Sequence, residues 1–404
     1  MEEKGLVNFF ADYLEHKSLF KNKSVLQGNY TPEKIYHRDE QIQQLASIIA
    51  PLLRLERPSN LFIYGKTGTG KTVTVRFVAH QLRKVAQEKN IPVKIVYVNC
   101  KLKKIVDTEY RLIAQLIREF GKTIPPTGLP TDEVYNIFYS TIDTVKQVIV
   151  IILDEIDQLV EKNGNDIMYN LTRMNSELKH AQVALIGISN DLNFTNMLDP
   201  RVRSSLSEEE IIFPPYNAVQ LQEILVQRCR DAFHENTVEE GVLEKCAAFA
   251  AREHGDVRRA LELIRVAGEL VEREHASRIS LKYLDQAEEK IEKDTMVDAV
   301  KGQPRQFQLT LYSILSIGVQ KKEAIFTGEI YDVYTQLCGK TGMRPLTQRR
   351  VSDIIAEMDM LGMITAKVIS KGRYGRTREI GLAISPDVCP NILNILEEEL
   401  GLVS

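Results

Sequence analysis

Residues 65–72 read Gly65-Lys66-Thr67-Gly68-Thr69-Gly70-Lys71-Thr72 and match every fixed position of a phosphate-binding loop. An apolar run precedes the loop and apolar residues at helical spacing follow it, so the loop connects a predicted strand to a predicted helix. Glycines let backbone N–H groups turn toward phosphate oxygens, and the helix adds its positive N-terminal dipole. For a bound ATP or ADP, Lys71 is then expected to neutralise the β-phosphate and, in ATP, the γ-phosphate, and Thr72 to offer its hydroxyl to Mg²⁺. The alternative, a glycine-rich turn with an incidental Lys-Thr pair, is disfavoured by these flanking elements.

The second half of the predicted site is a six-residue apolar run, 148–153, that ends in Asp154 and Glu155. This pattern indicates a buried strand with two acids at its carboxyl end, where open α/β sheets bind ligands. Asp154 is expected to hold Mg²⁺ through water, and Glu155 to orient or deprotonate the attacking water. Acids after an apolar strand also cap helices, and the nearby phosphate loop is what favours the catalytic interpretation.

Further strand-like runs alternate with stretches long enough for helices, at residues 94–99, 183–189 and 210–213. This order predicts an α/β fold with a parallel sheet covered by helices on both faces. After Pro214 and Pro215 the strand signal stops. Asn217 and Gln220 form a capping box that opens a small helical domain, whose periodicity persists to about Lys293. A polar stretch with Gly302 and Pro304 is interpreted as a linker.

Residues 304–404 predict helices over 306–317, 329–338 and 346–361, followed by strands over 364–370 and 377–384, which is the order of a winged helix. In the third helix one apolar stripe is formed by Val351, Ile354, Ile355, Met358 and Leu361. The polar residues outside that stripe and the basic hairpin supply the candidate DNA contacts. They are Thr347, Gln348, Arg349, Arg350, Lys371, Arg373, Tyr374, Gly375, Arg376 and Arg378. A solvated hairpin or a protein-binding winged helix is the alternative.

The composition of the chain limits the classes of protein to which it can belong. A chain of 404 residues predicts two or three domains, and a net charge of −3 argues against a wholly basic nucleic-acid coat, so any DNA contact is expected to be local. Five widely separated cysteines indicate neither a zinc site nor a redox motif, which fits a reducing cytosol. The N-terminus lacks a secretory signal pattern, and the longest apolar run is too short to span a bilayer. We therefore expect a cytoplasmic, nucleoid-associated protein without a membrane partner.

Together these residues resemble AAA+ ATPases, whose sensor-1 residue follows the strand after the paired acids. The resemblance implies that Asn190 positions water against the γ-phosphate. The stretch from Asp199 to Arg203 looks like the arginine-finger region, with Arg201 the better match and Arg203 the reserve. Gly255-Asp256-Val257-Arg258 resembles sensor 2, which implies that Arg258 reaches the γ-phosphate from the lid. In the plainer interpretations Arg201 pairs with an acid and Arg258 lies on a solvated helix face.

Over nearly its full length the chain resembles the archaeal origin-recognition-complex (Cdc-six-like) AAA+ replication initiators. The matching stretches are His37–Glu40, Leu153–Asp157, Gly255–Leu261 and Gly372–Thr377. The resemblance implies an ATPase core over 1–215, a lid over 216–298 and a winged helix over 304–404. It also implies that Tyr36, His37 and Arg38 lie near the adenine. An insertion near 101–131, with Lys103 and Lys104, is implied to touch DNA.

The same resemblance implies a slow ATPase that acts as a switch, binds double-stranded origin DNA, joins related initiator subunits and helps to recruit the replicative helicase. Two other classes stay open at this point. An ATP-switched winged-helix transcription regulator usually lacks an acid equivalent to Glu155. A branch-migration motor also joins AAA+ to a winged helix, and it differs by forming rings and hydrolysing ATP quickly.

Overall fold

The structure, a computed structural model, describes residues 17–28, 30–101, 108–125, 127–206, 208–320, 325–370, 376–384 and 388–402. The chain forms two compact units, divided between Leu284 and Asp285. This boundary falls inside the helix α13 (Leu281–Lys301). The predicted domain limits 1–215, 216–298 and 304–404 stay predictions, because the division into compact units does not separate the ATPase core from the lid.

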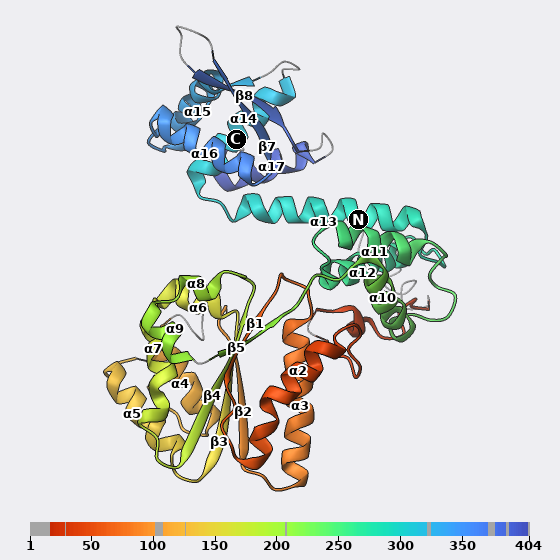
Figure 1. Cartoon of the computed structure of the whole chain (residues 1–404). Coiled ribbons are helices and arrows are strands. Elements are labelled where there is room, and N and C mark those ends of the chain that lie inside the picture. The colour runs from red at the N-terminus through yellow and green to blue at the C-terminus, as the bar shows by residue number, and fades with distance from the viewer. Residues whose placement is uncertain are drawn as a thin grey trace, which may run out of the picture. The chain divides into compact units, whose positions relative to one another are not determined.

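The first unit contains a five-stranded parallel sheet in the order β2-β3-β4-β1-β5 (Figure 1). The strands are β1 (Asn60–Tyr64), β2 (Val93–Asn99), β3 (Gln147–Asp154), β4 (Ala181–Ser189) and β5 (Glu208–Ile212). Strands β1, β3 and β4 are buried over almost their whole length, which explains why each reads as an unbroken apolar run. The predicted α/β class with a parallel sheet is confirmed.

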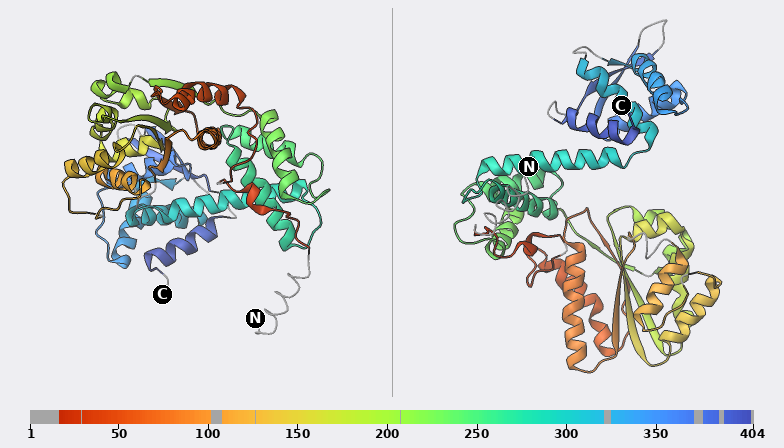
Figure 2. Two further views of the ribbon diagram at one scale, coloured as in Figure 1. Left: turned by 90° about the horizontal axis from the view of Figure 1, so that it is seen from below. Right: turned by 180° about the vertical axis from the view of Figure 1, so that it is seen from behind.

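Alternate strand residues supply two separate cores. Leu61 and Ile63 of β1 pack with α2 and α3, whereas Phe62 and Tyr64 pack with the helices of the opposite face. Figures 1 and 2 show these two helical layers on either side of the sheet. The short helix η1 (Lys23–Leu26) comes first and packs on the lid helices described below. The helices around the sheet are α2 (Asp39–Ile49), η2 (Ala50–Arg54), α3 (Lys71–Glu88), α4 (Glu109–Glu119), α5 (Thr131–Ile142), α6 (Ile156–Asn163), α7 (Asp166–Arg173), η3 (Met174–Ser176), α8 (Phe194–Met197) and α9 (Pro200–Leu206).

The lid follows β5 as the helices α10 (Ala218–Ala232), α11 (Val242–Arg252) and α12 (Val257–Arg273). The predicted capping box is present, because the Asn217 side chain accepts from the Gln220 N–H and the Gln220 side chain accepts from the Asn217 N–H. Helix α13 continues to Lys301, eight residues past the predicted end at Lys293, so the predicted linker shrinks to residues 302–304.

The second unit is a winged helix, as predicted. Its helices are α14 (Arg305–Gln320), α15 (Thr327–Thr341), α16 (Gln348–Met360) and α17 (Cys389–Leu400), and its strands are β6 (Ile325–Phe326), β7 (Ile364–Ser370) and β8 (Arg376–Leu382). The strands form an antiparallel sheet in the order β6-β8-β7. Four residues of the predicted stripe on α16 are buried, but Leu361 is 48% exposed because the helix ends at Met360.

Candidate functional site

The phosphate loop joins β1 to α3, and two of its glycines have backbone angles that other residues rarely adopt. Gly68 has φ +70° and Gly70 has φ +89°. A Cβ atom on Gly68 would lie 1.7 Å from Asp256 Oδ1, and one on Gly70 would lie 2.8 Å from Tyr216 Oη. The Gly68 carbonyl also accepts from the Val257 N–H at 3.3 Å. The loop therefore needs glycine both for its turn and for its close contact with the start of α12.

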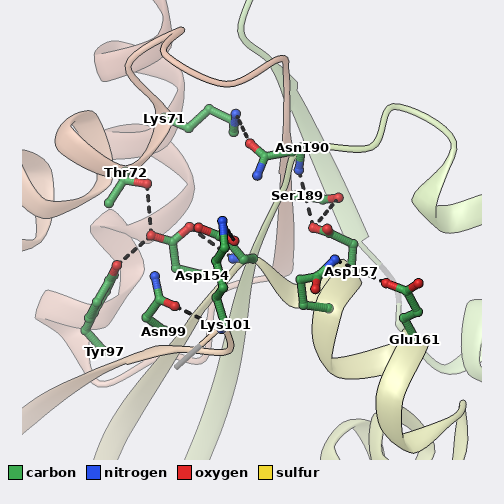
Figure 3. Close-up of polar contacts among 12 residues, drawn as sticks. Lys71, Thr72, Tyr97, Asn99, Lys101, Asp154, Asp157, Glu161, Ser189 and Asn190 are labelled. Carbon is green, nitrogen blue, oxygen red and sulfur yellow. Dashed lines mark hydrogen bonds and ion pairs between the residues drawn. The ribbon is translucent and has the colours of Figure 1, made fainter. Parts of the chain in front are cut away.

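Lys71 is the first residue of α3, and its ammonium group is buried inside the loop. Its Nζ donates to the carbonyl oxygens of Gly65 (2.6 Å) and Lys66 (2.7 Å) and to Asn190 Oδ1 (2.9 Å). Burial lowers the pKa of Lys71 to about 8, and the nearby Asp154 carboxylate opposes that shift. The structure thus brings the predicted lysine and the predicted sensor-1 asparagine into direct contact (Figure 3).

Thr72 and Asp154, the two predicted Mg²⁺-binding residues, are also in contact. Thr72 Oγ1 donates to Asp154 Oδ2 at 2.9 Å, and Tyr97 Oη donates to the same oxygen at 2.5 Å. Burial raises the pKa of Tyr97 to about 12, with a further contribution from the Asp154 charge. A hydroxyl beside a buried carboxylate is the kind of oxygen-ligand set that Mg²⁺ prefers, so these residues fit that ion.

Glu155 and Asn190 lie at the ends of neighbouring strands. Glu155 follows β3 with φ +57°, and its Oε2 lies 3.7 Å from Lys101 Nζ. Beyond β4, the Asn190 N–H and the Ser189 hydroxyl both donate to Asp157 Oδ1, at 3.4 and 2.9 Å. Asp157 therefore ties the end of β4 to α6, and sequence reasoning assigned it no role.

One cavity connects these groups. The predicted site residues that line it are Thr67, Gly68, Thr69, Gly70, Lys71, Thr72, Asp154, Glu155, Asn190 and Arg258. Gln27, Gly28, Tyr30 and Arg228 line it as well and were not predicted. No motif marks them, because they come from an irregular N-terminal segment and from the middle of α10. Gly65 and Lys66 contribute through the carbonyls that bind Lys71.

Tyr36, His37 and Arg38 separate into different environments. Tyr36 lines a second cavity, together with Gly70, Val73 and Tyr216. His37 Nε2 lies 2.9 Å from Glu223 Oε2 without making a hydrogen bond. The predicted location beside a nucleotide base stays a prediction for both residues, and His37 lines neither cavity.

Arg38 is almost fully buried, at 2% exposure, and does not line either cavity. Its Nε donates to the Thr69 carbonyl at 2.9 Å and its Nη2 to the Pro214 carbonyl at 2.6 Å. Its guanidinium lies 3.7 Å from the centre of the Tyr216 ring. Arg38 thus joins the phosphate loop to the segment that leads into the lid.

The predicted arginine-finger residues lie away from this cavity. Arg201 is bonded to Asp199, with Nε and Nη2 donating to its two carboxylate oxygens at 3.1 and 3.0 Å. Its side chain is nevertheless 76% exposed, and Arg203 is exposed too. Neither residue lines the cavity that holds Lys71.

On the winged helix, residues 347–350 are all exposed. Thr347 is the N-cap of α16, with its hydroxyl accepting from the Arg350 N–H, and Arg350 Nη1 lies 3.9 Å from Asp353 Oδ2. Arg378 differs from these residues, because its Nη1 donates to the Ser352 carbonyl at 3.0 Å. Lys103, Lys104, Lys371, Arg373, Tyr374 and Gly375 lie outside the described residues, and Arg376 is described only as the first residue of β8.

Among the described residues, no helix combines the length and the apolar content that crossing a bilayer requires.

Three family profiles match the chain in order. They are an AAA domain at residues 54–194, a Cdc6 AAA+ ATPase-type lid domain at 222–289 and a CDC6 C-terminal winged helix domain at 298–390. With the parallel sheet and the phosphate loop at the end of β1, they define the class: this is an AAA+ protein with a Cdc6-type lid and winged helix.

Full-length relatives narrow this class. The chain is 52% identical over 396 residues to the ORC1-type DNA replication protein of Thermococcus onnurineus, which covers 97% of this chain and 95% of the relative. It is also 52% identical to the ORC1-type DNA replication protein of Thermococcus kodakarensis, again over 396 residues, which cover 97% of this chain and 95% of that relative. The chain therefore belongs to the family of ORC1-type DNA replication proteins. The solved structure of the Aeropyrum pernix ORC1 protein in complex with DNA is 40% identical, with a TM-score of 0.81 over 95% of this chain and 98% of that one.

Proposed function

We propose that the protein is a replication initiator that binds ATP or ADP with Mg²⁺, hydrolyses ATP slowly and binds double-stranded DNA at a replication origin. One observation gives the main support for nucleotide binding. The Lys71 ammonium and Asn190 meet at 2.9 Å, and Thr72 and Asp154 meet at the same distance, all lining one cavity beneath a glycine loop. Four polar groups from three separate segments converge there, which is how a built nucleotide site differs from an incidental glycine turn.

The proposed roles follow from position and charge. Lys71 and the N–H groups of residues 65–72 bind phosphates, and Thr72 and Asp154 hold Mg²⁺, which supplies positive charge to the phosphate oxygens. Glu155 orients or deprotonates the attacking water, and Asn190 positions that water. Arg258, which lines the cavity from α12, is the proposed lid cation. Its N–H donates to Asp256 Oδ1 at 2.7 Å, which caps the start of α12, and the Val257 N–H donates to the Gly68 carbonyl at 3.3 Å, which joins that start to the loop.

Slow hydrolysis is proposed because, among the residues that the structure describes, neither Arg201 nor Arg203 lines the cavity that holds Lys71. Arg201 is bonded to Asp199 and does not line that cavity. We propose that Arg201 instead serves the nucleotide of a related initiator subunit, with Arg203 in reserve. An arginine supplied in this way contributes several orders of magnitude to the rate of phosphoryl transfer. The single subunit would then act as a switch that reports its nucleotide state.

Duplex binding is assigned to the winged helix. The four exposed residues 347–350 at the start of α16 are suited to base edges and phosphates, and Arg376 and the basic hairpin residues of the sequence would add backbone or minor-groove contacts. Arg378 is the weaker candidate, because it already donates to Ser352. The Aeropyrum pernix relative was solved in complex with DNA, which supports DNA binding by this protein. Lys103 and Lys104 are proposed as a second contact from the ATPase core, and recruitment of the replicative helicase is proposed from family membership.

The test is filter binding of the full chain to an origin duplex and to a scrambled duplex of equal length. A sequence-specific initiator binds the origin duplex at least 100-fold more tightly at physiological salt, and both affinities fall with rising salt as counterions are released. Arg349→Ala should weaken origin binding about tenfold and reduce the preference between the two duplexes. Equal affinity for both duplexes would contradict origin recognition by this protein.

A further inference from the structure

The strand β2 places a tyrosine hydroxyl on the carboxylate of Asp154. In the register between β2 and β3, Asn99 is opposite Asp154, and Tyr97 lies two residues earlier on the same face of the sheet. Tyr97 Oη donates to Asp154 Oδ2 at 2.5 Å, next to the Thr72 hydroxyl that donates to that oxygen at 2.9 Å (Figure 3). The second oxygen, Oδ1, accepts from the Glu155 N–H at 3.0 Å. Asp154 is 4% exposed, so protein donors fix both of its oxygens.

The Tyr97 ring is itself held in place by α3. The Arg76 guanidinium lies 4.2 Å from the centre of that ring, one helical turn after Thr72. Arg76 and Tyr97 both line a third cavity, between α3 and β2. The ring therefore has open space beside it, and the stack on Arg76 restricts its movement. Two elements therefore hold the Tyr97 hydroxyl at Asp154: β2, which carries Tyr97, and α3, whose Arg76 stacks on the ring.

Tyr97 and Thr72 differ in one respect. The Thr72 hydroxyl oxygen is itself proposed to bind the cation through a lone pair, while its hydrogen can still be donated to Asp154. Among the described contacts, Tyr97 is the other side chain that donates to Oδ2, and it has no proposed role as a ligand of the ion. Partners of this kind fix the orientation of a metal-binding carboxylate, and their loss costs about 10- to 100-fold in metal affinity.

We propose that Tyr97 is a positioning residue for the Mg²⁺ of the nucleotide complex, and that its hydroxyl keeps the Asp154 carboxylate oriented toward the ion without being a ligand itself. This inference rests on the proposed function, in which Thr72 and Asp154 hold Mg²⁺. It concerns a residue of the edge strand that neither the phosphate loop nor the paired acids predict.

The experiment compares the full-length wild-type protein with Tyr97→Phe, which keeps the ring that stacks on Arg76. Affinity for fluorescent ADP is measured in EDTA and then across a Mg²⁺ titration. Tyr97→Phe should need about tenfold more Mg²⁺ for half of the Mg²⁺-dependent gain in affinity, and its affinity in EDTA should equal that of the wild type. Tyr135→Phe is the matched control, because Tyr135 Oη donates to Glu109 Oε1 at 2.6 Å in the same unit but outside the site. That control should titrate like the wild type, although both variants lose one tyrosine–carboxylate bond.

Thr72→Ala distinguishes failure of this inference from failure of the proposed function. If Thr72→Ala loses the Mg²⁺ dependence and Tyr97→Phe titrates like the wild type, the role of Tyr97 is overturned and the metal site stands. If the wild type shows no Mg²⁺ dependence, the metal site is overturned and the role of Tyr97 with it. A shift in Tyr97→Phe that Tyr135→Phe reproduces would also overturn the inference, since the effect would then be structural. Thermal unfolding of both phenylalanine variants checks that each is folded.

Discussion

Lys71 binds its own loop through two carbonyl oxygens while its ammonium group is shielded from water. Desolvation makes the charged form costly, and it lowers the pKa of Lys71 to about 8. A polyphosphate beside the ammonium group would reverse this effect, because an adjacent negative charge favours the protonated form. Binding of nucleotide and binding of a proton should therefore be linked at this one residue.

The linkage predicts that nucleotide affinity falls as pH rises. Above about pH 8 the free protein has lost the Lys71 proton that the complex must regain, so affinity should drop about tenfold between pH 7 and pH 9. Titration calorimetry at pH 8.5 in buffers of different ionisation enthalpy should detect proton uptake. Lys71→Arg is the control, since its guanidinium stays charged and should give a flat profile. An equal slope in that variant would assign the pH dependence to another group.

Sequence could predict the residues of the site that a motif fixes, and only those. The phosphate loop and the paired acids were predicted because their spacing is set by the nucleotide and the sheet, and Asn190 was predicted from the resemblance to AAA+ ATPases. Tyr97 and Asp157 contact these residues directly, but each looks ordinary in sequence, the first in a strand and the second in a helix. Which hydroxyl meets which carboxylate depends on strand register, and the composition of a strand does not reveal that register.

At the scale of elements, long apolar runs predicted the strands to within three residues at each end, and α10 began where its capping box indicated. Two elements were missed in the winged helix. Strand β6 has only two residues and exists through its pairing with β8, and α17 follows the last predicted strand without a strong start signal. Helix α13 was predicted too short, although Met296, Val297, Ala299 and Val300 of its last two turns pack with the core of the second unit.

The capping box of α10 gives a prediction at this scale. Asn217→Ala removes the acceptor for the Gln220 N–H at 2.9 Å, which should cost about 1 kcal/mol of local helix stability. Amide hydrogen exchange in the first turn of α10 should then be about fivefold faster, because local opening becomes more frequent. Asn217→Asp retains a side-chain acceptor and should exchange like the wild type. Unchanged exchange in Asn217→Ala would mean that packing alone fixes this end of α10.

At the scale of the whole molecule, the proposed nucleotide site and the proposed duplex-binding residues belong to different compact units. Lys71 lies in the first unit, and residues 347–350 lie in the second. Each unit has a hydrophobic core of its own. Damage to the ligand site of one unit should therefore leave the fold of the other intact.

The predicted result is separation of the two activities in the full chain. Lys71→Ala should lower ATP affinity at least 100-fold and abolish hydrolysis, because the phosphates lose their buried cation. Its affinity for origin duplex, measured without nucleotide, should stay within about twofold of the wild-type value. Arg349→Ala should give the opposite pattern, with ATP affinity unchanged. Retained ATP binding in Lys71→Ala would refute the assigned nucleotide site.

The Arg38 guanidinium has a consequence for how this protein tolerates amino-acid changes. Its two anchoring bonds end on the carbonyl oxygens of Thr69 and Pro214, which every amino acid possesses. Replacing the side chain of Thr69 or Pro214 leaves the backbone acceptor in place. Replacing Arg38 removes both bonds at once and leaves two carbonyl oxygens without this donor. The two bonds therefore depend on the side chain of Arg38 and not on the side chains of its two acceptors, so a change at Arg38 is the one that breaks this connection.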